Sequence, residues 1–325
     1  MDWTQRIGRR LKPRDLSIFM VVVEKQNMAL AADHLAISRP VVSKTISDLE
    51  RTLGVQLFDR FPHGVEPTLY GRALFKRSSA IFDELRQSVE ELDFLADPRT
   101  GELRIATTEA LSAGLIAATI DRLVRRFPRW TFQSVVSGVG TRTELLRSRQ
   151  VELVVARQYA HDASISAETL FFDRLLVVAG PTSIWARQRK ITLADLVEAP
   201  WIQARHEIEP GAPTYEAFRR LGLEVPEVKI LSDSIDLRYG LLAKGDFVTM
   251  IPESVLRFAP ARKLLKVLPL DIPRWTHPTA ITTLKNRTLS NPARLFIECI
   301  RELAKPLGEE KRHTDDTPRS KARSG

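Results

Sequence analysis

Cysteine is almost absent from this 325-residue sequence, which contains a single thiol, Cys299. One cysteine cannot form an internal disulfide, and this composition fits a reducing compartment, so we expect a cytoplasmic protein. Apolar runs such as FMVVV, residues 19–23, are far shorter than the ~20 residues that a membrane span needs. The first ten residues contain three arginines and no uninterrupted apolar segment, so we expect neither a secretory signal nor a membrane partner.

The motifs of common enzyme classes are missing as well. The sequence contains no GxSxG, Walker loop, HExxH or CxxC pattern. Its six histidines, at positions 34, 63, 161, 206, 277 and 313, lack the spacing of metal ligands. Asp233 and Asp236 fit helix caps or surface positions better than an acid–base pair, and Cys299 lies in the apolar segment LFIECI. We therefore expect no catalysis, no metal and no other cofactor.

Charge is distributed unevenly along the chain. The net charge is +9, which favours contact with a polyanion. Residues 1–77 contain thirteen Lys or Arg against eight Asp or Glu, whereas residues 78–97 contain one arginine against six acids. With 43% hydrophobic residues the chain can bury substantial cores, and its length predicts two or three domains.

Residues 38–53 form a predicted helix with two different faces. An apolar stripe with helical spacing consists of Val42, Ile46, Leu49 and Leu53. The opposite face carries Pro40 and short hydroxyl or basic side chains, namely Ser43, Lys44, Ser47 and Arg51. Ser38 is the expected N-cap of this helix, and Asn27 is the expected N-cap of the helix before it. Two such helices separated by a few residues are typical of a helix-turn-helix.

A hairpin and a long helix are predicted next. Residues 55–60 and 64–68 are extended pieces joined through Pro62-His63-Gly64, which indicates a wing. Thr68 can cap a helix that continues to Ala96, where Asp97-Pro98 ends it.

This long helix carries an apolar stripe with heptad spacing. The stripe consists of Phe75, Phe82, Val89 and Ala96, with Leu85 and Leu92 between them. It can pack on its own domain or against a second copy of the chain. Dimerisation is the favoured interpretation, because a solvated helix of this length has to bury the stripe somewhere.

From residue 101 onward, strand-like segments alternate with helical ones. The nine candidate strands are ELRIAT, TFQSVV, VELVVAR, RLLVVAG, WIQA, VKILSD, FVTMIP, LKVLPL and TAITTL. This alternation predicts an α/β architecture with largely parallel sheets, and the number of strands indicates two subdomains. Residues 309–325 are charged and poor in apolar side chains, so we expect disorder there.

The segments NMALAADHLAISRPVVSKTISDLERTLGVQLFDR and GVEPTLYGRAL resemble the LysR-type transcriptional regulators. The later segments GELRIATTEALSAGLIAATIDRLVRRFP, ELLRSRQVELVVAR and GDFVTMIP resemble the effector domain of that family more loosely. The resemblance implies a winged helix-turn-helix, a dimerising linker helix and a two-lobed, periplasmic-binding-protein-like α/β effector domain. It also implies a homodimer or homotetramer that binds double-stranded promoter DNA, responds to a small metabolite and can contact RNA polymerase.

The resemblance places the domain boundaries. We expect the winged helix-turn-helix at residues 1–67, the linker helix at 68–97 and the effector domain at 98–308. Lobe I of that domain would contain about residues 101–170 and 277–308, and lobe II about residues 171–276. SRPVVSKTISDLE and GVEPTLYGRAL also resemble a branch with regulators of sugar uptake and aromatic-acid catabolism. This suggests a catabolic or uptake operon and a sugar, sugar acid or aromatic carboxylate as effector.

Side chains at the start of a recognition helix reach base edges in a major groove. The DNA-contact candidates are Arg39, Pro40, Val41, Ser43, Lys44 and Ser47, with Arg60 of the wing for the minor groove or a phosphate. Relatives often carry glutamine where this chain has Arg39, which shifts the expected preference from adenine toward guanine or phosphate. For Arg39 and Lys44 the alternative is a solvated helix face.

Ligands of two-lobed α/β domains lie at strand C-termini and helix N-termini near the crossover between lobes. The effector-site candidates are Thr107, Thr108, Gly138, Val139, Arg157, Arg205 and Ser232. Hydroxyl and guanidinium groups suit a carboxylate or a polyhydroxylated metabolite. Two alternatives stay open: these side chains are caps and surface ion-pair partners, or the α/β domain serves assembly without a small ligand. Asp246 replaces a glycine common in relatives, so we also expect an altered loop beside the cleft.

Overall fold

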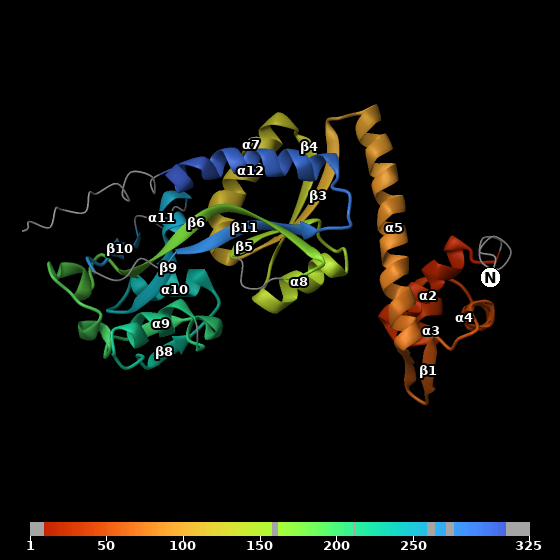
Figure 1. Ribbon diagram of the computed structural model, residues 1–325, viewed down its shortest axis with the longest axis horizontal. Helices are drawn as coiled ribbons and strands as arrows, with labels where there is room; N and C mark the ends of the chain where they lie inside the picture. The colour runs from red at the N-terminus through yellow and green to blue at the C-terminus, as the bar shows by residue number, and fades with distance from the viewer. Residues whose placement is uncertain (1–9, 158–161, 211, 259–263, 271–275, 310–325) are drawn as a thin grey trace, which may run out of the picture. The chain divides into compact units, whose positions relative to one another are not determined.

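The computed structural model describes residues 10–157, 162–210, 212–258, 264–270 and 276–309 (Figure 1). The chain divides into two compact units, Met1–Leu92 and Asp93–Gly325. Within the described ranges, no helix combines the length and the apolar character needed to cross a membrane. Residues 310–325 of the expected disordered tail lie outside these ranges, whereas Glu309 ends a helix.

The first unit is a bundle of short helices with a two-stranded hairpin. Its elements are α2 (Pro13–Lys25), α3 (Met28–His34), α4 (Arg39–Leu53), β1 (Phe58–Phe61), β2 (Gly64–Pro67) and α5 (Leu69–Ala96). Asn27 caps α3, because its Oδ1 accepts the N–H of Ala29 at 2.8 Å. Ser38 holds the N-cap position of α4, but its side chain makes no capping hydrogen bond, so the expected side-chain cap is wrong.

The apolar stripe of α4 is buried as its spacing predicts. Val42 and Ile46 are fully buried and Leu49 is 2% exposed. They share one core with side chains of α2 and of the hairpin, where the rings of Phe19 and Phe58 lie 5.4 Å apart. Burial of this stripe fixes which face of α4 points outward.

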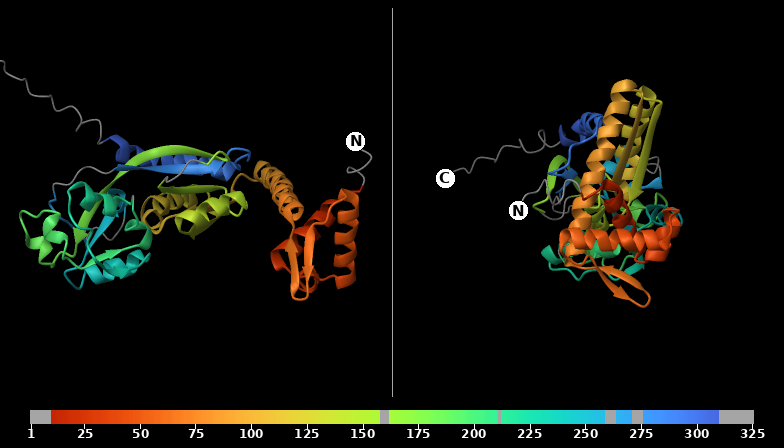
Figure 2. Two further views of the ribbon diagram at one scale, coloured as in Figure 1. Left: turned by 60° about the horizontal axis from the view of Figure 1, so that its bottom comes forward. Right: turned by 90° about the vertical axis from the view of Figure 1, so that its right-hand side faces the viewer.

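The predicted wing and the start of the long helix are confirmed. β1 and β2 pair antiparallel from Phe58 and Pro67 to the turn at Phe61 and Gly64, and the hairpin extends beyond the helices of its unit (Figure 2). Thr68 caps α5, because its hydroxyl accepts the N–H of Gly71 at 3.1 Å.

Gly71 lets α5 approach the backbone that precedes the wing. A Cβ at this position would lie 2.2 Å from the carbonyl oxygen of Leu57. We expect Gly71→Ala to lower the free energy of unfolding of the first unit by about 1–3 kcal/mol, because one backbone segment must shift. Chemical denaturation measures the change. Gly140→Ala is the matched control, since a Cβ there meets nothing within 4 Å; equal stability of both variants would contradict the prediction.

The second unit contains all nine predicted strands. The strands are β3 (Thr100–Thr107), β4 (Arg129–Val136), β5 (Leu153–Arg157), β6 (Ile165–Ala179), β7 (Trp201–Gln203), β8 (Val228–Leu231), β9 (Val248–Pro252), β10 (Lys266–Val267) and β11 (Thr276–Leu284). The α-helices are α6 (Glu109–Leu111), α7 (Ala117–Arg126), α8 (Val139–Arg147), α9 (Pro213–Arg220), α10 (Ile235–Leu242), α11 (Glu253–Phe258) and α12 (Asn291–Glu309). A π-helical turn covers Ser112–Ile116, and 3-10 turns cover Trp185–Arg187, Ala194–Leu196 and Arg205–Glu207.

The strands form two half-sheets that share β6. The order is β4-β3-β5-β11-β6-β9-β7-β8, with β10 also on β6. β3 runs parallel to β4 and β5, and β7 runs parallel to β8 and β9. All four pairings of β6 and β11 are antiparallel, so the expectation of largely parallel sheets is wrong in part. The reason is that these strands run from one half-sheet to the other or return the chain, and do not follow a helical crossover.

Each half-sheet has its own core, and we call the two halves lobe I and lobe II. In lobe I, α12 and α7 cover one face of the sheet and α8 covers the other (Figure 1). Its core includes Ile105, Phe296 and Cys299, and burial raises the pKa of that thiol. The core of lobe II includes Trp201 and Phe218, whose rings meet edge to face at 5.6 Å. β6 passes through both lobes, pairing with β11 in lobe I and with β9 in lobe II.

Candidate functional site

The face of α4 opposite its buried stripe is open to solvent. Exposed residues on it are Arg39, Pro40, Val41, Lys44 and Ser47, and Ser43 is half-buried. Neither Arg39 nor Lys44 forms an ion pair with any residue that the structure describes. This basic, hydroxyl-bearing surface, the outer face of α4, is therefore available to an external partner.

Arg60 lies in β1, one residue before the turn of the wing, and is partly held by the protein itself. Its guanidinium is 3.5 Å from Oε2 of Glu50, while Oε1 of Glu50 accepts the N–H of Leu57 at 2.9 Å. Glu50 therefore ties α4 to the wing and orients Arg60, whose side chain remains 51% exposed. Two further arginines of the first unit are also engaged by the protein: Arg51 pairs with Asp48, and Arg72 donates to the carbonyl of Pro67 at 2.6 Å.

The apolar stripe of α5 is divided between core and solvent. Phe75, near the start of the helix, packs against the core of the first unit. Further along, Leu85, Val89 and Leu92 are 49%, 58% and 66% exposed. The second half of α5 thus presents apolar side chains that the described residues of the first unit leave exposed.

A cavity of about 350 Å³ lies between the two lobes of the second unit. Lobe I contributes the segments around Thr108–Leu111, Val136–Gly138, Arg142 and Arg157. Lobe II contributes residues from the ends of β7 and β9 and from the starts of α9 and α10, including His206, Glu207, Thr214, Asp233, Ile235, Arg238 and Met250. The volume is that of a site for a small molecule.

The structure brings some of the predicted effector-site residues to this cavity. Thr108, Gly138 and Arg157 line it. Thr107 does not, because its side chain is fully buried and its hydroxyl donates to the carbonyl of Val155 at 2.9 Å. Arg205 is exposed outside the lining.

The two remaining candidates have backbone roles near the cavity. Ser232 is not a lining residue, and its carbonyl oxygen accepts hydrogen bonds from Arg238. Val139 follows Gly138 and is the first residue of α8.

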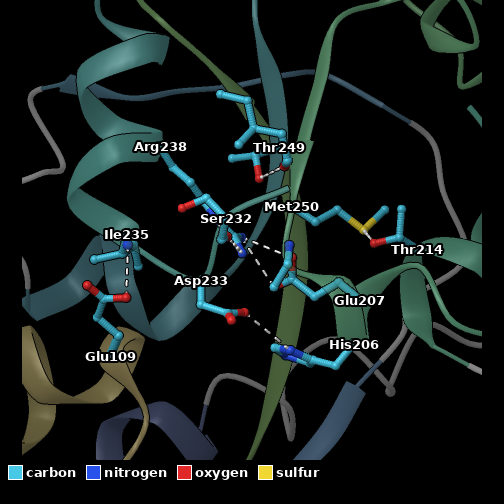
Figure 3. Close-up of polar contacts among 12 residues, drawn as sticks. Glu109, His206, Glu207, Thr214, Ser232, Asp233, Ile235, Arg238, Thr249 and Met250 are labelled. Carbon is cyan, nitrogen blue, oxygen red and sulfur yellow. Dashed lines mark hydrogen bonds and ion pairs between the residues drawn. The ribbon is translucent and has the colours of Figure 1, made fainter. Parts of the chain in front are cut away.

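A buried ion pair, absent from the sequence-based candidates, supports the lobe II wall. Arg238 is 3.0 Å from Glu207, and its side chain is 7% exposed. Glu207 also accepts the N–H of Ala204 at 2.7 Å, while Arg238 donates to the carbonyl of Ser232 at 2.9 Å (Figure 3). The pair thus joins the turn after β7 to the turn after β8.

His206 and Asp233 project from these two turns. Nδ1 of His206 lies 3.8 Å from Oδ1 of Asp233, and the two side chains point toward one another (Figure 3). Both line the cavity and are well exposed.

Glu109 connects the lobes directly. It lies in the first turn of α6 in lobe I, and its Oε2 accepts the backbone N–H of Ile235 in lobe II at 2.9 Å (Figure 3). Ser234 caps the same end of α10 by accepting the N–H of Leu237 at 3.3 Å. In the first turn of α10, one N–H group therefore donates to the helix's own cap and another to a carboxylate from the opposite lobe.

Two titratable groups on neighbouring strands lie near Arg157. Burial raises the pKa of Asp173, although Ser254 donates to it from N–H and hydroxyl and Arg157 favours its charged form. His277 is its partner residue across β6 and β11. Burial, with a contribution from Arg157, lowers the pKa of His277 to about 4.

The low pKa of His277 predicts a pH-dependent stability. As the pH falls, the imidazole of His277 becomes protonated near pH ~6.5 in the unfolded chain, before it does so in the folded protein. The stability that the folded protein has with a neutral His277 is therefore complete above pH ~6.5 and is lost as the pH falls toward 4. We expect the unfolding free energy of the wild type to drop about 1 kcal/mol more than that of His277→Gln across this window, allowing for solvent screening. Urea titrations at several pH values measure it, and parallel profiles would contradict it.

Asp246 lies outside the cavity lining, in contrast to the expected loop change beside the cleft. Its Oδ1 accepts the N–H of Ile184 at 2.8 Å, and its carbonyl accepts the indole N–H of Trp185 at 2.7 Å. The aspartate therefore anchors the loop after β6.

Family models match both units of the chain. The model of the bacterial regulatory helix-turn-helix protein, lysR family, matches residues 13–72, and that of the LysR substrate binding domain matches residues 96–305. The HTH-type transcriptional regulator GbpR of Azospirillum brasilense is 30% identical over 299 residues, which cover 90% of this chain and 86% of that protein.

Solved structures show the same fold. CbnR, a LysR family transcriptional regulator, has a TM-score of 0.62 at 20% identity, covering 90% of this chain and 99% of that chain. Full-length LysG from Corynebacterium glutamicum has a TM-score of 0.64 at 18% identity, covering 91% and 99%. With both family models matched in order and a relative 30% identical along nearly the whole chain, this protein belongs to the LysR family of bacterial transcriptional regulators.

Proposed function

We propose that this regulator binds a specific promoter site through the outer face of α4, and that a small metabolite between the lobes of the second unit changes promoter activity. The observation that carries the proposal is the presence, in one chain, of an exposed basic helix face and a cavity of about 350 Å³ lined by both lobes. One structural neighbour, LysG, is described with a bound effector, arginine, and another, CbnR, in complex with its target DNA.

On the DNA side, each residue of the outer face of α4 has a proposed partner. Arg39 and Lys44 donate to guanine O6 and N7, Pro40 and Val41 contact thymine methyl groups, and Ser43 and Ser47 donate to or accept from base edges. Arg60 contacts the minor groove or a phosphate. Support for these roles comes from the exposure of this face and from the burial of the stripe opposite.

The assembly we propose is a homodimer, or a tetramer built from two dimers, in the cytoplasm. Residues 1–67 form the DNA-binding domain, 68–97 the dimerisation helix and 98–308 the effector domain. The exposed Leu85, Val89 and Leu92 support pairing through α5. A dimer presents two α4 helices to half-sites one helical turn apart or a multiple of it, so the operator would be partly palindromic. RNA polymerase is the proposed partner at the promoter.

On the effector side, Thr108, Gly138 and Arg157 are the proposed ligand contacts that line the cavity. A sugar, a sugar acid or an aromatic carboxylate is the proposed class of effector, and a catabolic or uptake operon the proposed target.

DNase I footprinting of the DNA upstream of its own gene and of neighbouring operons tests the proposal. We expect one protected, partly palindromic site, with an affinity that falls as salt rises because phosphate contacts release counterions. An effector should alter that footprint or its affinity. Equal affinity for unrelated DNA would refute a specific operator, and a footprint indifferent to every metabolite would favour an α/β domain used only for assembly.

A further inference from the structure

The cavity between the lobes has no excess of positive charge. Three arginines line it, at positions 142, 157 and 238, together with four acids, at positions 109, 173, 207 and 233. A site that attracts an anion usually concentrates charge of the opposite sign. The balance here gives a carboxylate ligand no net attraction.

The arginines of the cavity are also engaged by the protein. Arg238 is paired with Glu207 at 3.0 Å. Arg142, 7% exposed, donates to the carbonyl of Ser137 at 2.6 Å. Arg157 interacts with the carboxylate of Asp173. An anionic ligand would have to compete with these contacts.

Glu109 occupies a position where a ligand carboxylate could otherwise bind. Its Oε2 accepts the N–H of Ile235 at 2.9 Å in the first turn of α10, and both residues line the cavity. Helix N-termini attract anions, but this one already holds an anion that belongs to the protein. A second carboxylate beside Glu109 would be repelled.

Neutral polar groups without a described partner, by contrast, lie in the cavity wall and directly behind it. Oγ of Ser137, in the cavity lining, is buried and has no hydrogen-bond partner among the described residues. The amide of Gln203, fully buried, has neither its oxygen nor its nitrogen paired within the described ranges. Gln203 does not line the cavity itself. It is two residues beyond Trp201, which pairs with Val248, so the parallel register places it behind the wall, beside the lining residue Met250. Buried polar groups without partners are costly, and hydroxyl groups can both donate and accept.

The imidazole of His206 is the one aromatic ring among the described lining residues. These residues include no Phe, Tyr or Trp, so an aromatic acid would lack the large apolar rings on which it stacks best. We propose that the cleft selects an uncharged, polyhydroxylated molecule of the sugar class, and that Glu109 excludes the corresponding acids. This inference rests on the proposed effector function of the same cavity.

Matched ligand pairs test the proposal by titration calorimetry on the full-length protein. Each aldose is compared with its aldonate: D-galactose with D-galactonate, D-glucose with D-gluconate, and L-arabinose with L-arabinonate, with benzoate and L-arginine added. We expect at least one aldose to bind about tenfold or more tightly than its aldonate, since like charges beside each other disfavour binding. Binding of acids or L-arginine without any aldose would overturn the inference and leave an effector site in place. If no compound binds, the inference also fails, while the operator footprint tests the DNA-binding proposal independently.

Glu109→Gln tests the excluding role, because glutamine can still accept the N–H of Ile235 through its amide oxygen but carries no charge. We expect its affinity for the aldonate to rise about tenfold, and the aldose-to-aldonate ratio to shrink accordingly. Glu144→Gln is the matched control: it removes an exposed carboxylate of α8 outside the cavity lining and should keep the wild-type ratio. An unchanged ratio in Glu109→Gln, in a variant with the wild-type unfolding temperature, would overturn the role of Glu109.

Discussion

Lys44→Ala is expected to weaken operator binding by about tenfold or more, because the ammonium group would lose a base or phosphate contact in the major groove. The unfolding temperature should stay close to that of the wild type, since Lys44 is exposed and forms no ion pair within the described part of the chain. Gel-shift titrations at several salt concentrations measure the change. If Lys44 contacts a phosphate, the slope of log affinity against log salt should decrease by about one.

Two comparison variants make this result specific to α4. Lys76→Ala removes an exposed lysine of α5 and should have a smaller effect on operator affinity. Arg39→Gln restores the residue common in relatives; if Arg39 contacts a guanine, this change should move the base preference at one operator position toward adenine. Wild-type affinity of Lys44→Ala, with intact folding, would remove Lys44 from the DNA interface.

The double substitution Leu85→Glu with Leu92→Glu is expected to convert the proposed dimer to monomers and to reduce operator affinity more than any change on α4. Both side chains are about half exposed or more in the single chain, so their replacement should not disturb its fold. Charged residues at the core positions of a helical pair are strongly unfavourable, because they are desolvated on association. A monomer binds each half-site separately and loses the gain in effective concentration that linkage provides, on the order of 10²-fold or more.

Sedimentation velocity and gel shifts on the same samples measure these two effects together. Glu91→Lys is the control, since it changes the charge at an exposed position next to Leu92 but outside the heptad stripe. A double variant that stays dimeric would contradict the role of the stripe. A monomer that retains wild-type operator affinity would contradict the proposed two half-sites.

Local patterns predicted the elements of this protein well. The stripe of α4 could be recognised because four apolar side chains at helical spacing have to face a core; three of them are buried and the fourth, Leu53, is partly buried against the same core. Thr68 and the Asp97-Pro98 pair marked the ends of α5 because capping and helix termination depend on neighbouring residues. The nine strands were located for a similar reason, since each is a short segment of β-favouring residues.

The cleft could be predicted only in part, because its contacts join residues that are distant in sequence. Glu109 and Ile235 are 126 residues apart, and Glu207 and Arg238 are 31 apart; no spacing rule connects them. From the sequence, Thr107 and Thr108 were equally good candidates for the effector site, because both carry a hydroxyl group near the end of a predicted strand. The pleat of β3 decides between them: it directs Thr107 into the sheet interior toward Val155, while Thr108 starts the next helix at the cavity.

The continuity of β6 through both lobes limits how the cleft can move. A loop hinge swings freely, whereas a continuous strand that is hydrogen-bonded to a partner strand in each lobe resists bending and yields most easily in torsion about its own axis. The lobes should therefore open by counter-rotation, with residues near Arg174 and Leu175, where the partner of β6 changes from β11 to β9, as the pivot. Asp173, next to this pivot, would then move least, while groups at the rim such as His206 would sweep through the widest arc.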